Sequence, residues 1–305
     1  MQKENKEYFR LGYDNQKYMS VVPDVSIITP TYNRKQNLQN MLISLSQQTY
    51  PVDKFEVIVV DDGSYDGTDE MVSHLSLPYR FKYFWQEDRG SRRARARNIG
   101  INNARGKIII FLDSDVLCTY RLVEDHAEMH RKCDNYIVMG LQKCLAEGQG
   151  KSLYELRNGV ATKIRIPGLK MLKAIVHYHY LKLLEKQGQA SLGLTVCTMN
   201  ASVHKKHLID INGFDEDFDG RYGCEDMDLG YRLRLNGLDV CWLRKAIVYH
   251  QYHPVTEQSP SYDGTHINEL ILFLKHPEML QFSKIGIWKN GCYGKTVDQI
   301  KKMIG

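Results

Sequence analysis

The chain has 305 residues, 43% of them hydrophobic and 25% charged, which is the composition of an ordinary soluble globular protein and not of a disordered one. Its net charge of +5, from 41 Lys and Arg against 36 Asp and Glu, is too small to indicate a nucleic-acid-binding protein by itself. The seven cysteines form no C-x-x-C pair, which excludes the common zinc-site and thioredoxin-like motifs, so we expect buried, reduced thiols.

Strand-like and helix-like segments alternate in the first part of the chain. The strand-like runs are apolar, and such runs bounded by turn residues are typical of buried parallel strands. Their alternation with helices predicts an α/β fold whose mostly parallel sheet has helices on both faces. In chain order, we expect strands at Val25–Thr29, Phe55–Val60, Tyr79–Trp85 and Lys107–Leu112, and helices across Leu38–Leu45, from Thr68 as an N-cap, and across Ser91–Ala104.

The second part of the chain departs from this alternation. Residues 142–190 are rich in lysine and aromatic residues, and we expect a mainly helical insertion there. A strand at Leu194–Met199, a helix that begins at an acidic cluster, and a strand at Val240–Tyr249 are expected to follow. Phe282–Gly305 is expected to form a helix packed on the body, with contact to a membrane surface as the alternative.

Acidic residues follow two of the apolar strands. Asp61 and Asp62 come directly after Phe55–Val60, and Asp113 and Asp115 come directly after Lys107–Leu112. In open α/β sheets, ligands bind at the carboxyl ends of the strands. Carboxylates there suit a hard divalent cation that is held together with a diphosphate. A turn or helix cap is the simpler interpretation of Asp61.

Six segments stand in a fixed order along the chain: Val25–Asn33, Glu56–Ser64, Ala96–Gly100 and Ile110–Asp115, followed by Gly213–Asp215 and Glu225–Gly237. The first four resemble motifs of family 2 of the inverting glycosyltransferases, which have the GT-A fold with a Rossmann-like sheet. The last two resemble the acceptor-side motif of chondroitin polymerase and β-1,4-galactosyltransferase-type enzymes. Each motif is weak alone, whereas their order and spacing together are specific.

The resemblance implies a site for a nucleotide-diphosphate sugar and a metal ion. Asp115 of the D-x-D motif would bind Mn²⁺ or Mg²⁺, and Asp113 would contact the ribose, or the metal through water. Asp62 would accept the imide N–H of uracil, for which an ionised carboxylate is suited. Arg93 would contact the nucleotide, with Arg97 supporting it. The remaining nucleotide-sugar residues would be Pro30, Thr31 and Tyr32, which wall the base pocket, together with Arg34 and Ser114.

The resemblance also implies the residues that act on the acceptor. Asp226 would be the base that deprotonates the acceptor hydroxyl, and Glu225 would bind the acceptor or orient that base. His250 would complete the metal site, with His253 in reserve, because imidazole favours Mn²⁺ over Mg²⁺. The simpler interpretations remain open here: acids at a helix start are commonly caps, and a single histidine is usually structural.

The function that this resemblance implies is transfer of a hexose or N-acetylhexosamine, with inversion, from a UDP-sugar to a glycan, a lipid-linked saccharide or a peptide. The expected division is an N-terminal extension (1–23), a nucleotide-sugar-binding half (24–118), an acceptor-binding half with the helical insertion (119–255) and a helical tail (256–305). The polar N-terminus and the lack of a long apolar run lead us to expect a cytoplasmic protein, with peripheral contact at the inner membrane face as a further possibility.

Two other functions fit parts of the sequence. A sugar-phosphate nucleotidyltransferase also uses a nucleotide-binding sheet and a divalent metal, but it requires a Gly-rich loop, and Pro30–Arg34 contains no glycine. A basic module that binds nucleic acid or lipid through Arg89–Arg97 would bind polyanions in a salt-sensitive way, independently of Asp115. The oligomeric state, the sugar and the acceptor are not specified by the sequence.

Overall fold

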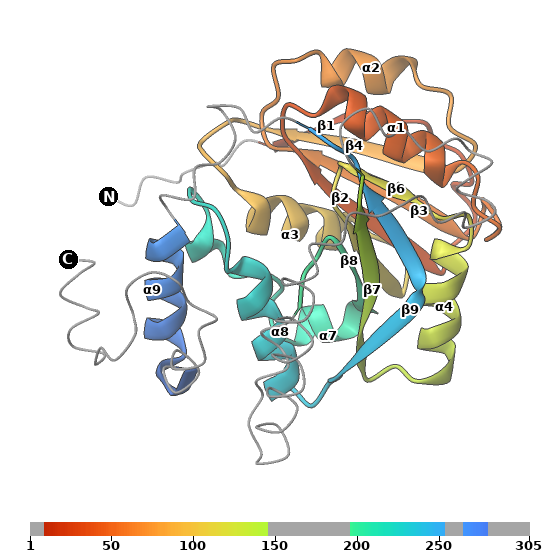
Figure 1. Ribbon diagram of the computed structural model, residues 1–305. Coiled ribbons are helices and arrows are strands. Elements are labelled where there is room, and N and C mark those ends of the chain that lie inside the picture. Colours follow the sequence, from red (N-terminus) through yellow and green to blue (C-terminus); the bar gives the residue numbers. More distant parts are fainter. Residues whose placement is uncertain (1–8, 146–195, 254–264, 280–305) are drawn as a thin grey trace.

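A nine-stranded mixed sheet forms the centre of the structure, in the order β1-β4-β3-β2-β5-β8-β7-β9-β6 (Figure 1). This computed structural model describes residues 9–145, 196–253 and 265–279. The strands are β1 (Phe9–Asp14), β2 (Val25–Thr31), β3 (Phe55–Asp61), β4 (Arg80–Gln86), β5 (Ile108–Leu112), β6 (Val116–Cys118), β7 (Tyr136–Cys144), β8 (Asn200–His204) and β9 (Asp239–His250).

The central strands β4, β3, β2 and β5 are parallel, as the apolar runs predict. Val25 at the start of β2 pairs with Phe55 on one side and Ile108 on the other, so the carboxyl ends of the three strands meet at one edge of the sheet. Antiparallel pairs extend this core on both sides, since β1 pairs with β4 and β8 pairs with both β5 and β7. The acids that follow β3 and β5 therefore lie at a common edge.

Helices cover both faces of the sheet (Figure 1). On one face α1, α2 and α4 bury side chains such as Leu42 and Val72 against Ile27 and Val57. On the other face α3, α7 and α8 pack against the alternate residues of the same strands, as Ile99 does against Ile28. The helices are α1 (Lys35–Leu45), α2 (Thr68–His74), α3 (Arg93–Asn103), α4 (Leu122–Lys132), α7 (Lys205–Asp210), α8 (Glu225–Leu235), α9 (Thr265–Lys275) and the 3₁₀ turn η2 (Glu216–Phe218).

Three sequence predictions about elements are wrong in detail. The residue before α2 is Gly67, with a φ of 79°, and Thr68 is the first helical residue, whose N–H and hydroxyl both bind Asp66. A strand is expected from the sequence at Leu194–Met199, but β8 begins only at Asn200. Asn200 and Ser202 of β8 are buried although they are polar, so no apolar run marks this strand in the sequence. Residues 142–144, assigned to the helical insertion, belong to β7, and the rest of that insertion lies almost entirely outside the described residues.

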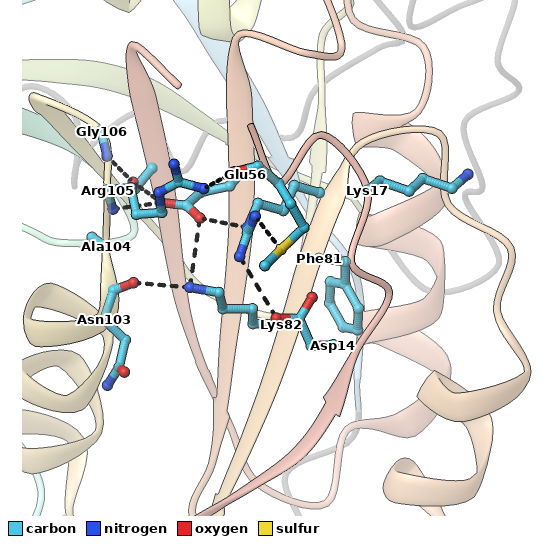
Figure 2. A network of polar contacts seen from close by, with 12 residues as sticks. Asp14, Lys17, Glu56, Phe81, Lys82, Asn103, Ala104, Arg105 and Gly106 are labelled. Atoms are coloured by element: carbon cyan, nitrogen blue, oxygen red, sulfur yellow. Dashed lines mark hydrogen bonds and ion pairs between the residues drawn. The ribbon is translucent and has the colours of Figure 1, made fainter. Parts of the chain in front are cut away.

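A buried charge network closes the opposite edge of the sheet, at the amino ends of the strands (Figure 2). The carboxylate of Glu56 is fully buried, and its Oε1 accepts hydrogen bonds from the Ser26 hydroxyl at 2.7 Å and the Arg105 N–H at 2.6 Å. Arg80 lies 3.4 Å from the other oxygen. The network ties the loop between α3 and β5 to the strand starts and so fixes the orientation of α3 across the sheet.

Among the residues that the structure describes, no helix has the length and hydrophobicity needed to cross a lipid bilayer.

Candidate active site

Asp115, His250 and His253 converge at the carboxyl edge of the sheet. β6 pairs with β9 so that Val116 lies opposite His250, and the N–H of Gln251 donates to the carbonyl of Asp115 at 2.8 Å. Asp115 Oδ2 consequently lies 3.1 Å from Nε2 of His253 and 3.4 Å from Nε2 of His250. Burial opposes ionisation of Asp115, but the hydrogen bonds and charges of the two histidines outweigh it and lower the pKa of the carboxyl group.

These three side chains fit a divalent cation. Each offers one ligand atom, and the three atoms lie within 4.8 Å of one another. Oδ1 of Asp115 and Nδ1 of His253 are buried and have no hydrogen-bond partner among the described residues. One carboxylate and two imidazoles form a donor set suited to Mn²⁺ better than to Mg²⁺. The sequence held His250 and His253 as alternatives, whereas the structure brings both to Asp115.

Asp62 is buried at the end of β3 with both oxygens occupied. Oδ1 accepts from Nε2 of Gln86 at 2.7 Å, and Oδ2 accepts from the N–H of Arg92 at 2.6 Å. Burial raises the pKa of Asp62 to about 6, while these hydrogen bonds oppose that rise. The neighbouring Asp61 accepts from the Tyr83 hydroxyl at 2.6 Å and from the N–H of Ser64 at 2.7 Å, so it closes a turn, as its simpler interpretation predicts.

The segment after β2 lies beside these acids. The carbonyl of Thr31 accepts from the N–H of Asp62 at 2.9 Å, directly after the half-buried Pro30. The hydroxyl of Tyr32 donates to Asp88 at 2.8 Å. Arg34 precedes α1, and its charge opposes the rise in the pKa of His250 that the hydrogen bond to Asp115 causes. The structure thus brings these residues, all predicted to bind the nucleotide sugar, to the edge that carries Asp62 and Asp115.

Helix α3 contributes two arginines that face acids. Arg97 is 2% exposed, and its guanidinium lies 2.9 Å from Glu225 and 3.4 Å from Asp113. Arg93 stacks on the ring of Tyr222, 4.3 Å from its centroid. Burial lowers the pKa of Arg93, but the nearby charges, with Glu225 the largest, raise it overall. Because these arginines are engaged with acids and an aromatic ring, they do not form the open basic face that a polyanion-binding module requires.

The acids at the start of α8 have opposite protonation tendencies. Glu225 is 5% exposed, and although burial opposes ionisation, Arg97 and Arg93 lower its pKa. Burial raises the pKa of Asp226 to about 7, and the charges of Glu225 and Asp113 add to that rise. Burial likewise raises the pKa of Asp113, with the charge of Asp115 adding to it. Ser114 between the two D-x-D acids is buried.

Some contacts at this site were not predicted from the sequence. Asp219 accepts hydrogen bonds from the N–H groups of Ala94 and Arg95, at 3.0 and 3.1 Å, and so caps the start of α3 from a distant loop. Asn98 binds both the N–H and the carbonyl of Phe214. A glycine-rich stretch with acids, Asp215–Gly223, was the available signal, but nothing in it identifies α3 as the partner.

Comparison with known families settles the membership of the chain. The model for glycosyl transferase family 2 matches residues 26–199, more than half of the sequence. The chain belongs to this family. A second model, the N-terminal domain of galactosyltransferase, matches residues 185–254 and includes the acids of α8. The family 2 resemblance and its galactosyltransferase-like acceptor block are therefore confirmed.

Individual relatives agree with this membership. An uncharacterized glycosyltransferase of Bacillus subtilis (strain 168), YfnE, is 34% identical over 261 residues, which cover 75% of this chain and 65% of YfnE. The chain thus spans slightly less than two thirds of that relative.

Two solved structures share the fold. The structure of S. aureus TarS 1–349 in complex with UDP-GlcNAc superposes with a TM-score of 0.60 at 19% identity, covering 92% of this chain and 70% of TarS 1–349. The mannosyltransferase PcManGT from Pyrobaculum calidifontis, in complex with GDP-Man and Mn²⁺, gives a TM-score of 0.52 at 19% identity, with coverages of 92% and 70%. These likenesses confirm the predicted GT-A fold.

Proposed function

We propose that this family 2 protein is a metal-dependent, inverting glycosyltransferase that moves a hexose or N-acetylhexosamine from a UDP-sugar to an acceptor hydroxyl. The observation that carries the proposal is the ion-pair chain in which Arg97 binds both Asp113 of the D-x-D motif and Glu225 of the acidic helix start. This ion-pair chain supports the proposal because it links the D-x-D motif, which contains the proposed metal ligand Asp115, to the residue next to the proposed base Asp226.

The nucleotide is proposed to bind across the ends of β2 and β3. A carboxylate has lone pairs for about four hydrogen bonds, so Asp62 can still accept the imide N–H of uracil while it keeps Gln86 and Arg92. Pro30, Thr31 and Tyr32 form the adjoining wall. Arg93 and Arg34 are proposed to supply positive charge for the diphosphate. We propose UDP as the nucleotide because Asp62 is assigned to the uracil ring. The structure of TarS, a structural neighbour, contains UDP-GlcNAc.

The cation is proposed to be Mn²⁺ or Mg²⁺, held by Asp115, His250 and His253. When bound, it would neutralise the charge that develops on the leaving diphosphate. Asp113, which shares the D-x-D motif with Asp115 and lies 3.4 Å from Arg97, is proposed to contact the ribose, or the metal through a water. PcManGT, whose structure contains Mn²⁺ beside a nucleotide sugar, supports a divalent cofactor.

Asp226 is proposed as the base. A single displacement with inversion requires one group that removes the acceptor proton on the face opposite the diphosphate. A carboxyl group with a pKa of about 7 is a stronger base than an ordinary aspartate and is still ionised in part at neutral pH. Glu225, which Arg97 holds in its charged form, is proposed to raise that pKa and to orient Asp226.

The acceptor is proposed to be a glycan, a lipid-linked saccharide or a peptide hydroxyl. Residues 24–118 would bind the nucleotide sugar and residues 119–255 the acceptor. The expected insertion within that second half would shape the choice of acceptor.

A nucleotide screen tests the proposal. The melting temperature of the protein is measured with UDP, GDP and dTDP, each with Mn²⁺ and with a chelator. UDP with Mn²⁺ is expected to raise it most, and UDP-sugars that do so are then tested for UDP release and for the β configuration of the product. Stabilisation by nucleotides that is the same with chelator would contradict the metal role, and no response to any nucleotide would contradict the function.

A further inference from the structure

Helix α9 lies beyond both family matches, which end at residues 199 and 254. It nevertheless packs beside α8, at the side of the molecule away from α4 (Figure 1). Leu272 and Phe273 of α9 are fully buried against Phe218, Cys224 and Tyr231. The helix therefore forms a small core of its own with the loop that leads into the acidic start of α8.

Asn268 connects α9 to this loop by two hydrogen bonds. Its side chain is fully buried, and Nδ2 donates to the carbonyl of Phe218 at 3.0 Å and to the carbonyl of Gly223 at 2.8 Å. Both bonds use the amide nitrogen, and the two carbonyls flank residues 219–222. One buried side chain thus closes the two ends of the loop on each other.

The closed loop makes the contacts that reach the nucleotide half. Asp219 caps α3 through Ala94 and Arg95, and the N–H of Gly220 donates to the carbonyl of Ser91 at 2.8 Å. Tyr222 stacks on Arg93. Because Asn268 fixes the separation of Phe218 from Gly223, it also fixes the positions from which Asp219, Gly220 and Tyr222 make these contacts.

The same loop determines how α8 begins. Gly223 has a φ of 92°, and Cys224, which is not a glycine, is held at 73° directly before Glu225. A non-glycine residue in this region is strained and persists only when surrounding contacts enforce it. The hydrogen bond from Asn268 to Gly223 is one of those contacts, and it acts on the residue before the strained one.

We infer that Asn268 is a positioning residue for the transfer reaction: it clamps the loop 218–223 so that Glu225 and Asp226 face Arg97 and Asp113. The inference rests on the proposed function, since it assigns Asn268 to the placement of the proposed base. On this inference α9, which lies outside the regions matched by the two family models, positions residues of the site. Asn268 itself touches no reacting group and acts through the backbone of the loop.

The test compares Asn268→Leu with Tyr231→Phe. Leucine keeps the branched shape and the number of side-chain heavy atoms of asparagine but removes both hydrogen bonds to the loop. Tyr231→Phe removes a hydrogen bond of similar length, 2.9 Å to Glu278, between α8 and the chain after α9, and leaves the loop untouched. The measurements are kcat with the UDP-sugar that the wild type turns over, the dissociation constant of UDP with Mn²⁺, and amide hydrogen exchange across residues 218–226.

In Asn268→Leu we expect kcat to fall about 10- to 100-fold, which is the usual consequence of a catalytic group displaced by about 1 Å. UDP affinity should change little, because α3 still packs on β2 and β3, and exchange across 218–226 should accelerate. Tyr231→Phe should alter none of the three measurements. If Asn268→Leu does not fold, the smaller change Asn268→Ala is measured in the same way.

A kcat within twofold of the wild type would overturn the inference, as would equal losses in both variants or a loss of UDP binding that matches the loss of kcat. Asp226→Asn is measured in parallel. If Asp226→Asn abolishes transfer while Asn268→Leu retains it, only the role of Asn268 is wrong. If Asp226→Asn retains full transfer, Asp226 is not the base. If the wild type transfers sugar from no UDP-sugar, the proposed function itself is wrong.

Discussion

Arg97 and Glu225 form a 2.9 Å ion pair although 128 residues separate them in the sequence. Arg97 comes from α3, within the proposed nucleotide-sugar-binding half, and Glu225 comes from the galactosyltransferase-like block. Both side chains are buried, so their charges are compensated mainly by each other and by Asp113. The pair therefore joins the two halves of the site and sets the local charge around Asp226.

Removing Arg97 should destabilise the protein strongly. Arg97→Ala leaves the buried Glu225 without its partner, and breaking a buried pair in this way costs about 3–5 kcal/mol. Urea denaturation measures the free energy of unfolding of the wild type and of each variant. Arg89→Ala is the control, because Arg89 and its partner Glu87 are both about half exposed and such pairs contribute at most about 1 kcal/mol. Equal, small effects of the two changes would show that the buried pair is not a structural link.

The rate should depend on pH through Asp226. Because the base must be ionised, kcat/KM is expected to rise with pH and to level off above about 7, the pKa of Asp226. Glu225→Gln removes a neighbouring negative charge, so the midpoint should move to lower pH. Asp226→Asn should keep UDP binding and lose transfer. A midpoint that stays in place in Glu225→Gln would assign the titration to another group.

The two histidines should both contribute to metal affinity. His250→Ala and His253→Ala are each expected to weaken Mn²⁺ binding at least about tenfold, in the range lost when supporting groups of metal sites are removed. Titration of Mn²⁺ in the presence of UDP measures this. His74→Ala, at an exposed position on α2, should leave Mn²⁺ affinity unchanged. If one of the two histidine variants binds Mn²⁺ as the wild type does, that histidine is structural.

A second group of histidines is buried under α4, away from the proposed metal. Nε2 of His126 lies 3.0 Å from Oδ1 of Asn200, whose amide nitrogen already donates to two backbone carbonyls, so His126 donates through Nε2. When His126 is neutral, its Nδ1 accepts from the Ser202 hydroxyl at 2.7 Å, and Nε2 of His130 can donate to the same hydroxyl at 2.8 Å. Neutral histidines therefore satisfy this chain of hydrogen bonds.

This network should make stability fall in acid. Burial lowers the pKa of His126 to about 4, below its ordinary value of 6.5. Its contribution is therefore complete above about pH 6.5 and is lost as the pH falls toward 4, by about 2 kcal/mol between pH 7 and pH 5. Urea unfolding at both pH values checks this. His126→Gln should reduce the pH dependence, whereas His74→Gln should not; an unchanged dependence in His126→Gln would assign it to other groups.

The sequence predicts those parts of the fold that are encoded locally. Ile108–Leu112 is apolar throughout and Phe55–Val60 is apolar except for Glu56, so their burial, their strand conformation and the acids at their ends follow from short segments. Asp115 and Asp226 could also be selected from the sequence, because each lies in a short motif that is defined by residue type and spacing. These elements form the parallel centre of the sheet and the acids of the site.

The parts that the sequence does not predict depend on distant partners. β1 is largely exposed, and it is a strand because it pairs with β4. Asn200 and Ser202 are polar yet buried, since His126 and His130 of α4 satisfy them. Pairing of β6 with β9 brings His253 to Asp115, so no local pattern could select both histidines.

The measurement that tests the central claim most directly is calorimetric titration of UDP into the wild type and into Asp115→Ala, with Mn²⁺ and with a chelator. The account predicts that the wild type binds UDP at least about tenfold more weakly with chelator than with Mn²⁺. It also predicts that Asp115→Ala binds UDP as weakly as the wild type with chelator, in both conditions. Binding of UDP that is equally tight in all four titrations would contradict it.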